Sequence, residues 1–380
     1  MHDRRLESSH VPDGSPRRPL TGIKVVDFSA LLPGPLASLI LADAGAEVVK
    51  IEKPGSGDDM RGYGPFLGSD GANFLLLNRG KVTQAVDLKA PEGLAVVRAL
   101  LADADVLIEQ FRPGVMERLG LSYADVSADN PGLIYCSITG YGQTGPKAHV
   151  AAHDLNYVGD TGMLSLVVDD QGMPSIPAVC VADIGGGAYP AVMNIMLALI
   201  DRGRTGHGRH LDISMSDNVF PFLYWALGNS LAGSPARPSG ELVTGATARY
   251  AIYRTRDQRF IAAAPIEEKF WRNFCAILEL EPSADKEEVE AKIATKDADE
   301  WMRLFEGRET CCSLIKTIDE ALADKHFEAR GCFDRRIAVG DTVIPGLPLP
   351  IVKDFGDVSS VRTAPTLSPA EITPSADSKR

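Results

Sequence analysis

The feature that most constrains the fold is an alternation of strand-like and helix-like segments through about the first 140 residues. The strand-like segments are short and rich in Val and Ile: "GIKVVDFS", "AEVVKIEKP", "DVLIEQF" and "LIYCSITGYG". Between them lie the helix-like "GPLASLILADAG" and "APEGLAVVRALLADA", in which Leu94, Val97, Leu100 and Leu101 recur at helical spacing. Strands and helices in regular rotation predict a doubly wound, Rossmann-like α/β domain with a parallel sheet.

In a domain of this kind, ligands bind at the carboxyl ends of the parallel strands. Two loops follow predicted strands at that edge, "SALLPGPL" after the first strand and "EKPGSGDD" after the second. We therefore expect a ligand site there. The ligand is not expected to be a dinucleotide cofactor, because "GYGQTG" lacks both the strand–loop–helix setting and the acidic residue about 20 positions further on.

The order of strand-like and helix-like segments changes after residue 215, which predicts a second, smaller α+β domain. We expect a large domain over 19–215, a linker over 216–243 that begins with an apolar helix at 216–232, and the small domain over 244–330. Within the small domain, a hairpin should turn at Arg256–Arg259. Residues 331–380 should return to the large domain and end in a disordered tail, and 1–18 should be a disordered leader.

Composition excludes several classes of protein. The net charge of −12 over 380 residues leaves no basic footprint for nucleic acid. The N-terminus lacks the apolar core of a signal peptide, and no stretch approaches the ~20 apolar residues of a membrane span. The six cysteines show no CxxC pairing and no His spacing of a zinc site, so we expect no metal site and a reduced, cytoplasmic protein.

Two segments carry candidate chemistry. His153 and Asp154 lie in "AAHDLNYVGDTG", before an apolar stretch, and Asp183 lies in "CVADIGGGAYPAVMNIMLAL", at the predicted start of a helix. A helix N-terminus concentrates free N–H groups and positive potential, and glycines let a ligand approach the backbone. A carboxylate beside such donors, with a histidine from another loop, suits proton removal next to a carbonyl. The structural alternatives are an N-capping Asp183, glycines needed for tight packing, and an ordinary surface or core His153.

Seven ordered blocks resemble the class III CoA-transferase superfamily, which includes formyl-CoA transferase, carnitine CoA-transferase and α-methylacyl-CoA racemase. The blocks are "GIKVVDFSALLPGP", "ADAGAEVVKIEKPG", "NRGKVTQAVDLK", "ADVLIEQFRPGVMERLGL", "LIYCSITGYGQTGP", "HDLNY" and "ADIGGG". The resemblance covers about residues 18–280 and extends more weakly to 355. It implies an interlocked homodimer, an acyl-CoA substrate, and no tightly bound cofactor.

The resemblance implies two alternative roles for Asp183. In the racemases, the matching Asp and the His matched here by His153 are two bases that exchange the proton at C2 of a 2-methylacyl-CoA. A Glu matched by Glu267 in "APIEEKF" pairs with that histidine from the partner subunit. In the transferases, the matching Asp is a nucleophile that forms a mixed anhydride and then an aspartyl-CoA thioester. The presence of all three residues favours the racemase, whereas "KIEKPGSGDDMRGYGPF" and "LLLNRGKVTQAVDLKAPEG" look more like the transferases.

The resemblance also implies where CoA binds. Basic groups and backbone N–H groups would hold its phosphates, and apolar positions its adenine. The matching positions are Leu31, Lys53, Val86, Asp87, Leu88, Lys89 and Arg112, and Ala152 stands where the racemases usually have Gly. Arg79 is a further basic candidate. Tyr157, which would share a helix face with His153, either positions the thioester or serves packing. The backbone N–H groups of Gly185 and Gly186 are expected to hold the thioester oxygen.

Overall fold

The computed structural model describes residues 18–169 and 171–367. The predicted leader, except for residue 18, and most of the predicted tail lie outside the described residues. By its internal contacts the chain divides into two units. The first comprises the chain up to Ile138, Ala191–Asp212 and the chain from Asp334, and the second comprises Thr139–Pro190 and Ile213–Phe333. These boundaries differ from the predicted domain boundaries in assigning the loop and helix around His153 to the second unit.

A six-stranded sheet in the order β5-β2-β1-β6-β7-β8 forms the centre of the first unit. Its strands are β1 (Lys24–Asp27), β2 (Glu47–Glu52), β5 (Val82–Ala85), β6 (Val106–Glu109), β7 (Ile134–Thr139) and β8 (His210–Ser214). The pairs β5–β2, β2–β1, β1–β6 and β6–β7 are parallel. The predicted doubly wound α/β class is therefore confirmed.

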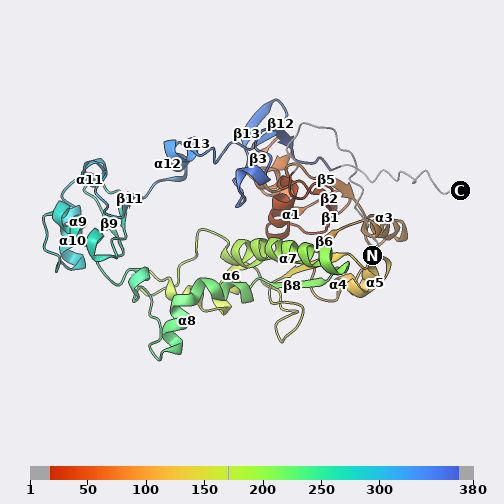
Figure 1. Cartoon of the computed structure of the whole chain (residues 1–380), viewed down its shortest axis with the longest axis horizontal. Helices are drawn as coiled ribbons and strands as arrows, with labels where there is room; N and C mark the ends of the chain where they lie inside the picture. Colours follow the sequence, from red (N-terminus) through yellow and green to blue (C-terminus); the bar gives the residue numbers. More distant parts are fainter. Residues whose placement is uncertain (1–17, 170, 368–380) are drawn as a thin grey trace, which may run out of the picture. The chain divides into compact units, whose positions relative to one another are not determined.

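Helices cover both faces of this sheet, and Figure 1 shows α1 and α3 on opposite sides of β1, β2 and β5. The helices of this part of the chain are α1 (Pro33–Asp43), α2 (Ala72–Asn78), α3 (Pro91–Ala102), α4 (Val115–Arg118), α5 (Tyr123–Asp129) and α7 (Tyr189–Thr205). Every residue of α1 is buried, because α1 lies between the sheet and α2. On the other face, Val97 and Leu101 of α3 pack with Val26 and Leu107 in one apolar cluster.

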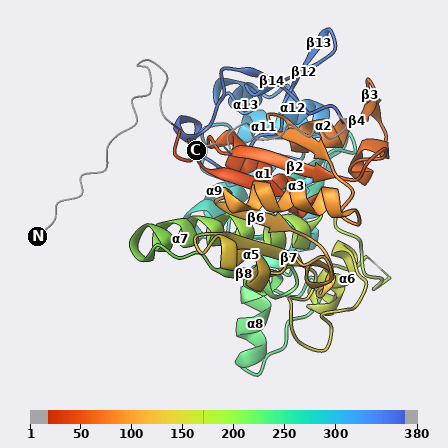
Figure 2. The same ribbon diagram turned by 90° about the vertical axis from the view of Figure 1, so that its right-hand side faces the viewer.

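The C-terminal segment adds a three-stranded sheet to the first unit, made of β12 (Arg336–Val339), β13 (Thr342–Pro345) and β14 (Val361–Thr363). Figures 1 and 2 place β12 and β13 near β3 (Phe66–Leu67), which pairs with β4 (Asp70–Gly71). The Arg335 guanidinium binds the buried Asp43 carboxylate, and the Gly80 N–H donates to Thr363 O at 2.8 Å. These bonds join the C-terminal segment to α1 and to the turn before β5.

The second unit contains α6 (Asp154–Asp160), a π-helical segment η3 (Ala182–Ala188), and a hairpin-based antiparallel domain. That domain holds β9 (Ala251–Arg254), β10 (Phe260–Ala263) and β11 (Cys312–Leu314), with α9 (Glu268–Leu278), α10 (Lys286–Ile293) and α11 (Ala298–Phe305) around one apolar core. The remaining helices are α8 (Tyr224–Leu231), α12 (Ile318–Leu322) and α13 (Lys325–Ala329). The hairpin turns where the sequence predicts it.

Two details differ from the sequence-based expectations. The apolar segment expected as one helix is a 3₁₀ helix, η4 (Asp217–Leu223), followed by α8, and η4 contains Pro221, which cannot donate a helical hydrogen bond. One continuous helix, Ala182–Thr205, is long and apolar enough to cross a membrane by length and composition alone. Core helices meet the same criterion, so this helix carries no membrane assignment. The six cysteines form no disulfide.

Candidate active site

Asp183 is the second residue of the π-helical segment η3, which leads directly into α7. A π-helical turn leaves the regular hydrogen-bond ladder of an α-helix and occurs often at functional sites. The Asn218 side-chain amide donates to Gly186 O at 2.9 Å. A Cβ on Gly186 would lie 2.3 Å from Met215 O, so only glycine allows this approach of the backbone. The glycines after Asp183 thus serve packing, and they also shape the turn that carries Asp183.

His153 is the N-cap of α6, with extended backbone angles and an exposed side chain. Its backbone N–H donates to the Asn156 side-chain oxygen at 3.0 Å, which fixes the start of the helix. Asp154, the first residue of α6, then points its carboxylate at the start of η3. One oxygen of Asp154 accepts hydrogen bonds from the N–H groups of Ala182 at 2.7 Å and Asp183 at 3.0 Å.

The Asp154 carboxylate therefore brings the His153 and Asp183 segments together. It also occupies two of the N–H groups that the sequence analysis expected to be free at the start of this helix, because a carboxylate is a strong acceptor for them. Gly185 and Gly186, the predicted N–H donors to a thioester oxygen, lie further along η3. Their proposed role stays a prediction.

The electrostatics of this site are dominated by negative charge. Burial, and then the charge of Asp154, raise the pKa of Asp183 to about 6, while His153 acts in the opposite direction. Ligand-type atoms of Asp154, Cys180 and Asp183 lie within 4.8 Å of one another. In the described ranges, 18–169 and 171–367, no Lys or Arg forms an ion pair with either aspartate. A carboxyl group poised near neutral pH beside a histidine is suited to accept and return a proton.

The spacing of the cysteines predicts no metal site, but the cluster of Asp154, Cys180 and Asp183 has the donor types that a cation would use. One Asp154 oxygen already caps η3, which explains that carboxylate without a cation. We assign no metal to this cluster.

Tyr157 and Ala152 lie beside His153 and pack against each other. Tyr157 is 6% exposed, and its hydroxyl donates to Ala152 O at 2.7 Å. A Cβ on Gly140 would lie 2.3 Å from the Tyr157 ring, so the ring seats directly on the backbone after β7. Tyr157 thereby holds the loop that precedes His153, which is the packing role that the sequence left open.

Glu267 is the N-cap of α9, in the antiparallel domain. Its carbonyl accepts a hydrogen bond from Trp271 N–H at 2.9 Å, and its charge helps to raise the pKa of Cys311, after burial. Among the described residues, no hydrogen bond or ion pair joins Glu267 to His153 or Asp183. Its pairing with the histidine of a partner subunit stays a prediction.

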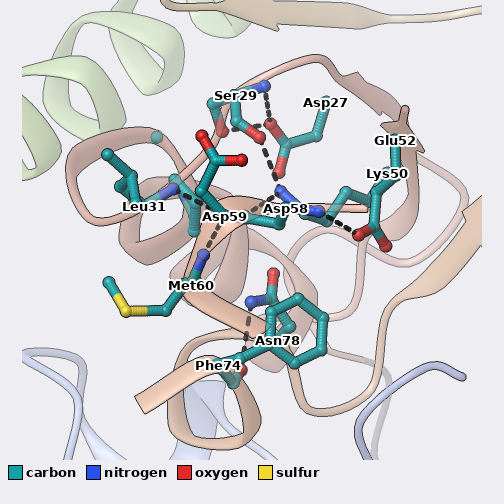
Figure 3. A network of polar contacts seen from close by, with 12 residues as sticks. Asp27, Ser29, Leu31, Lys50, Glu52, Asp58, Asp59, Met60, Phe74 and Asn78 are labelled. Atoms are coloured by element: carbon teal, nitrogen blue, oxygen red, sulfur yellow. Dashed lines mark hydrogen bonds and ion pairs between the residues drawn. The ribbon is translucent and has the colours of Figure 1, made fainter. Parts of the chain in front are cut away.

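The two loops expected to bind CoA adjoin each other at the carboxyl ends of β1 and β2, as Figure 3 shows. Leu31 has a positive φ of 63°, and its N–H donates to the Asp58 carboxylate at 3.1 Å. Lys53 is exposed, and its ammonium lies 2.9 Å from Asp59. One apolar and one basic predicted contact therefore stand on adjacent loops.

The other predicted CoA positions have different surroundings. Arg79 is 1% exposed and paired with Asp43 at 2.8 Å, an anchoring contact within the fold. Val86 is buried in the core of the α3 face, Leu88 packs against that core, and Asp87, Lys89 and Arg112 are exposed. The exposed residues remain open to a ligand, whereas Arg79 would reach one only by leaving its pair with Asp43.

Sequence reasoning missed two residues that organise these sites, Asp154 and Lys50. Lys50 lies in the middle of the apolar run "EVVKIE", and a lysine in a buried strand needs a partner, which was the available signal. Asp154 was noticed only as the neighbour of His153. Its role depends on contact with residues nearly thirty positions away, which no local pattern contains.

Known proteins resemble this chain over most of its length. The model of CoA-transferase family III matches residues 20–368. Alpha-methylacyl-CoA racemase from Mus musculus is 35% identical over 361 residues, covering 92% of this chain and 90% of the racemase. Succinate–glutarate CoA-transferase from Agrobacterium fabrum is 36% identical over 374 residues, covering 92% and 93%. The crystal structure of a CaiB/BaiF family protein from Brucella suis matches with a TM-score of 0.81 at 31% identity, covering 92% of this chain and 97% of that one.

Proposed function

The chain belongs to CoA-transferase family III, and from that premise we propose that it is a racemase or epimerase acting at C2 of a 2-methylacyl-CoA thioester. The main support for this proposal is that the segments carrying the two candidate bases are in contact. Asp154 ties the start of α6, where His153 lies, to the start of η3, where Asp183 lies. A two-base reaction needs an imidazole and a carboxylate near each other.

In the proposed reaction, His153 or Asp183 takes the proton from C2, depending on the configuration of the substrate. The C2–H bond breaks, and its electron pair forms an enolate whose oxygen is held by N–H groups of η3. The other residue then gives a proton to the opposite face of C2. One proton is taken and one is returned, so the reaction needs no oxidant, reductant or second substrate.

The raised pKa of Asp183, about 6, supports this role. A base whose pKa lies near the working pH takes up a proton and releases it with comparable ease. Asp183 must serve as acceptor for one enantiomer and as donor for the other, so a pKa near neutrality favours both directions of the reaction.

A second candidate function is CoA transfer between carboxylic acids, favoured by the 36% identity to a CoA-transferase. In that reaction, the Asp183 carboxylate attacks the acyl-CoA carbonyl and CoA thiolate leaves, which gives a mixed anhydride. The thiolate then attacks the Asp183 carbonyl and releases the acyl carboxylate. The acceptor carboxylate attacks the resulting aspartyl-CoA thioester and again displaces the thiolate, which gives a second mixed anhydride. The thiolate then attacks the acceptor's carbonyl, which forms the new acyl-CoA and frees the Asp183 carboxylate. This route needs Asp183 but gives no task to His153.

We propose further that the protein acts as a homodimer in the cytoplasm, with Glu267 of one subunit orienting His153 of the other. The support is that Glu267 lies at the exposed start of α9 and has no described partner for its carboxylate in its own chain. Size-exclusion chromatography with light scattering tests the dimer. Mixing an inactive His153→Ala chain with an inactive Glu267→Ala chain tests the shared site, because refolded hybrid dimers would recover one active site.

The experiment that separates the two functions follows exchange of the C2 proton. A single enantiomer of a 2-methylacyl-CoA is incubated with the protein in deuterated buffer, with and without an added carboxylic acid. Deuterium uptake with loss of chirality, independent of the acid and abolished by His153→Ala, supports the racemase. Movement of CoA to the acid without exchange at C2, and retained by His153→Ala, overturns it in favour of the transferase.

A further inference from the structure

A lysine that is fully buried, Lys50 of β2, connects the two loops that are proposed to bind CoA (Figure 3). Its ammonium donates to Ser29 O at 2.5 Å, in the loop after β1, and lies 2.9 Å from the Asp58 carboxylate, in the loop after β2. Both side chains of the ion pair have zero exposed area. Lys50 therefore cannot touch a ligand in solvent, although it lies between two loops that can.

The Asp58 carboxylate, in turn, binds backbone N–H groups of both loops. One carboxylate oxygen accepts hydrogen bonds from Leu31 N–H at 3.1 Å and Met60 N–H at 3.0 Å. The other oxygen faces Lys50. Leu31 adopts a left-handed backbone conformation that is unfavourable for a leucine, so an outside contact must hold it there.

Further charges of β2 and β1 complete the network. Glu52, two residues after Lys50 and on the same face of β2, accepts from Asp58 N–H at 2.7 Å and pairs with Arg61. Asp27 at the end of β1 accepts from the Ser29 N–H at 2.9 Å and from the Ser38 hydroxyl at 2.5 Å. Charged side chains of β1 and β2 thus hold the two loops in place.

A buried ion pair of this kind is a poor way to gain stability, because desolvation offsets its attraction. It does fix geometry, since each charge requires its partners at defined positions. An apolar pair of the same volume would satisfy none of the backbone groups at Ser29, Leu31 and Met60.

We infer that the Lys50–Asp58 pair is a positioning device for the nucleotide end of CoA, which sets the relative placement of the Leu31 and Lys53 loops without contacting the ligand. The inference rests on the proposed function only in taking CoA as the ligand. Both candidate reactions use CoA, so the inference holds for either of them.

The test measures binding of free CoA and of adenosine 3′,5′-bisphosphate by calorimetry, which needs no turnover. The variant is Lys50→Met with Asp58→Asn, which removes both charges together and leaves an acceptor for the Leu31 and Met60 N–H groups. The matched control is Lys81→Met, since Lys81 is also a buried lysine and pairs with Asp27 of the same network, but its hydrogen bonds go to Pro35 O and Asn78 and not to the loop after β2.

We expect the double variant to bind CoA at least about tenfold more weakly, with kcat at saturating acyl-CoA within about threefold of the unmodified protein. The control should bind within about threefold. Hydrogen exchange should accelerate in residues 28–36 and 53–62 of the double variant and not in its other segments. A folded double variant that binds CoA as tightly as the unmodified protein would overturn the inference.

If the double variant does not fold, Asp58→Asn alone is measured, because it keeps the same acceptor and Lys50. Unchanged CoA affinity in that variant overturns the inference equally. If the unmodified protein itself binds neither CoA nor the bisphosphate, both the proposed function and the inference fail. Normal binding by the unmodified protein, with no activity in either assay, removes the proposed function alone.

Discussion

Two carboxylate-rich regions of this chain use the same residue types in opposite ways. At the ends of β1 and β2, each buried acid has a basic partner, such as Lys50 for Asp58 and Arg61 for Glu52. At the start of η3, Asp154 and Asp183 lie together, and no described Lys or Arg forms an ion pair with either. Paired opposite charges hold the backbone around them in place. A neighbouring like charge instead raises the pKa of a buried carboxyl group toward neutral pH.

The pKa values follow this difference. Burial opposes ionisation of Asp27, but Lys50 and Lys81 together hold the pKa of that carboxyl below its usual range. At Asp183, burial and Asp154 act in the same direction and raise the pKa to about 6. Where cationic neighbours compensate its charge, a buried acid stays ionised and serves the structure. Where they do not, its pKa rises toward neutral pH and it is suited to proton transfer.

The largest effect on stability is expected from breaking a compensated pair. Lys50→Met alone leaves the Asp58 carboxylate buried without a cation, and we expect a loss of about 3–5 kcal/mol in the free energy of unfolding. Urea denaturation at pH 7 measures this loss. A loss below about 1 kcal/mol would contradict the assignment of Lys50 as the essential partner of a buried carboxylate.

Removing an uncompensated buried charge should instead increase the free energy of unfolding. The pKa of Asp183 is raised in the folded state, so its ionisation lowers stability as pH rises from about 4 to about 6. We expect Asp183→Asn to be more stable by about 1–3 kcal/mol at pH 7, with a gain that shrinks toward pH 4. The same variant should lose activity by about 10²-fold or more. A destabilised, inactive variant would indicate that Asp183 is a structural residue.

A smaller effect separates the charge of Asp154 from its hydrogen bonds. Asp154→Asn keeps an acceptor for the N–H groups of Ala182 and Asp183 but removes the negative charge. The pKa of Asp183 should fall, and the acidic limb of the pH–rate profile should move down by about half a unit to one unit. The control is Asp154→Ala, which should also lose about 1 kcal/mol of stability as a helix cap is lost. An unmoved acidic limb in Asp154→Asn would count against coupling of the two aspartates.

The smallest effect on stability is expected at the exposed edge of the compensated region. Lys53 and Asp59 form a pair with 64% and 52% of their side chains exposed. Lys53→Ala should change the free energy of unfolding by less than about 0.5 kcal/mol. If Lys53 contacts a CoA phosphate, the same variant raises KM for acyl-CoA and weakens its salt dependence. An unchanged KM at low and high salt would remove Lys53 from the binding site.

Much of the fold of the first 140 residues could be predicted, because the sheet strands there are apolar runs and the helices have clear periodicity. β5 was not predicted, since "VTQA" is short and half polar and becomes a strand only by pairing with β2. The segment 216–232 was predicted as one helix, and the local effect of Pro221 was overlooked. The site residues His153 and Asp183 came from motifs, but the link between them did not.

By itself, the sequence determined the parallel α/β class, the family and the residues that carry the candidate chemistry, because these depend on local pattern and on ordered motifs. Only the tertiary structure decided how these residues are used. Burial and contacts between distant segments determine whether a charge is compensated, as for Lys50 and Asp58, or left without a cation, as for Asp183 beside Asp154. The electrostatic environment of a side chain is a property of its neighbours in space, and a sequence lists only its neighbours along the chain.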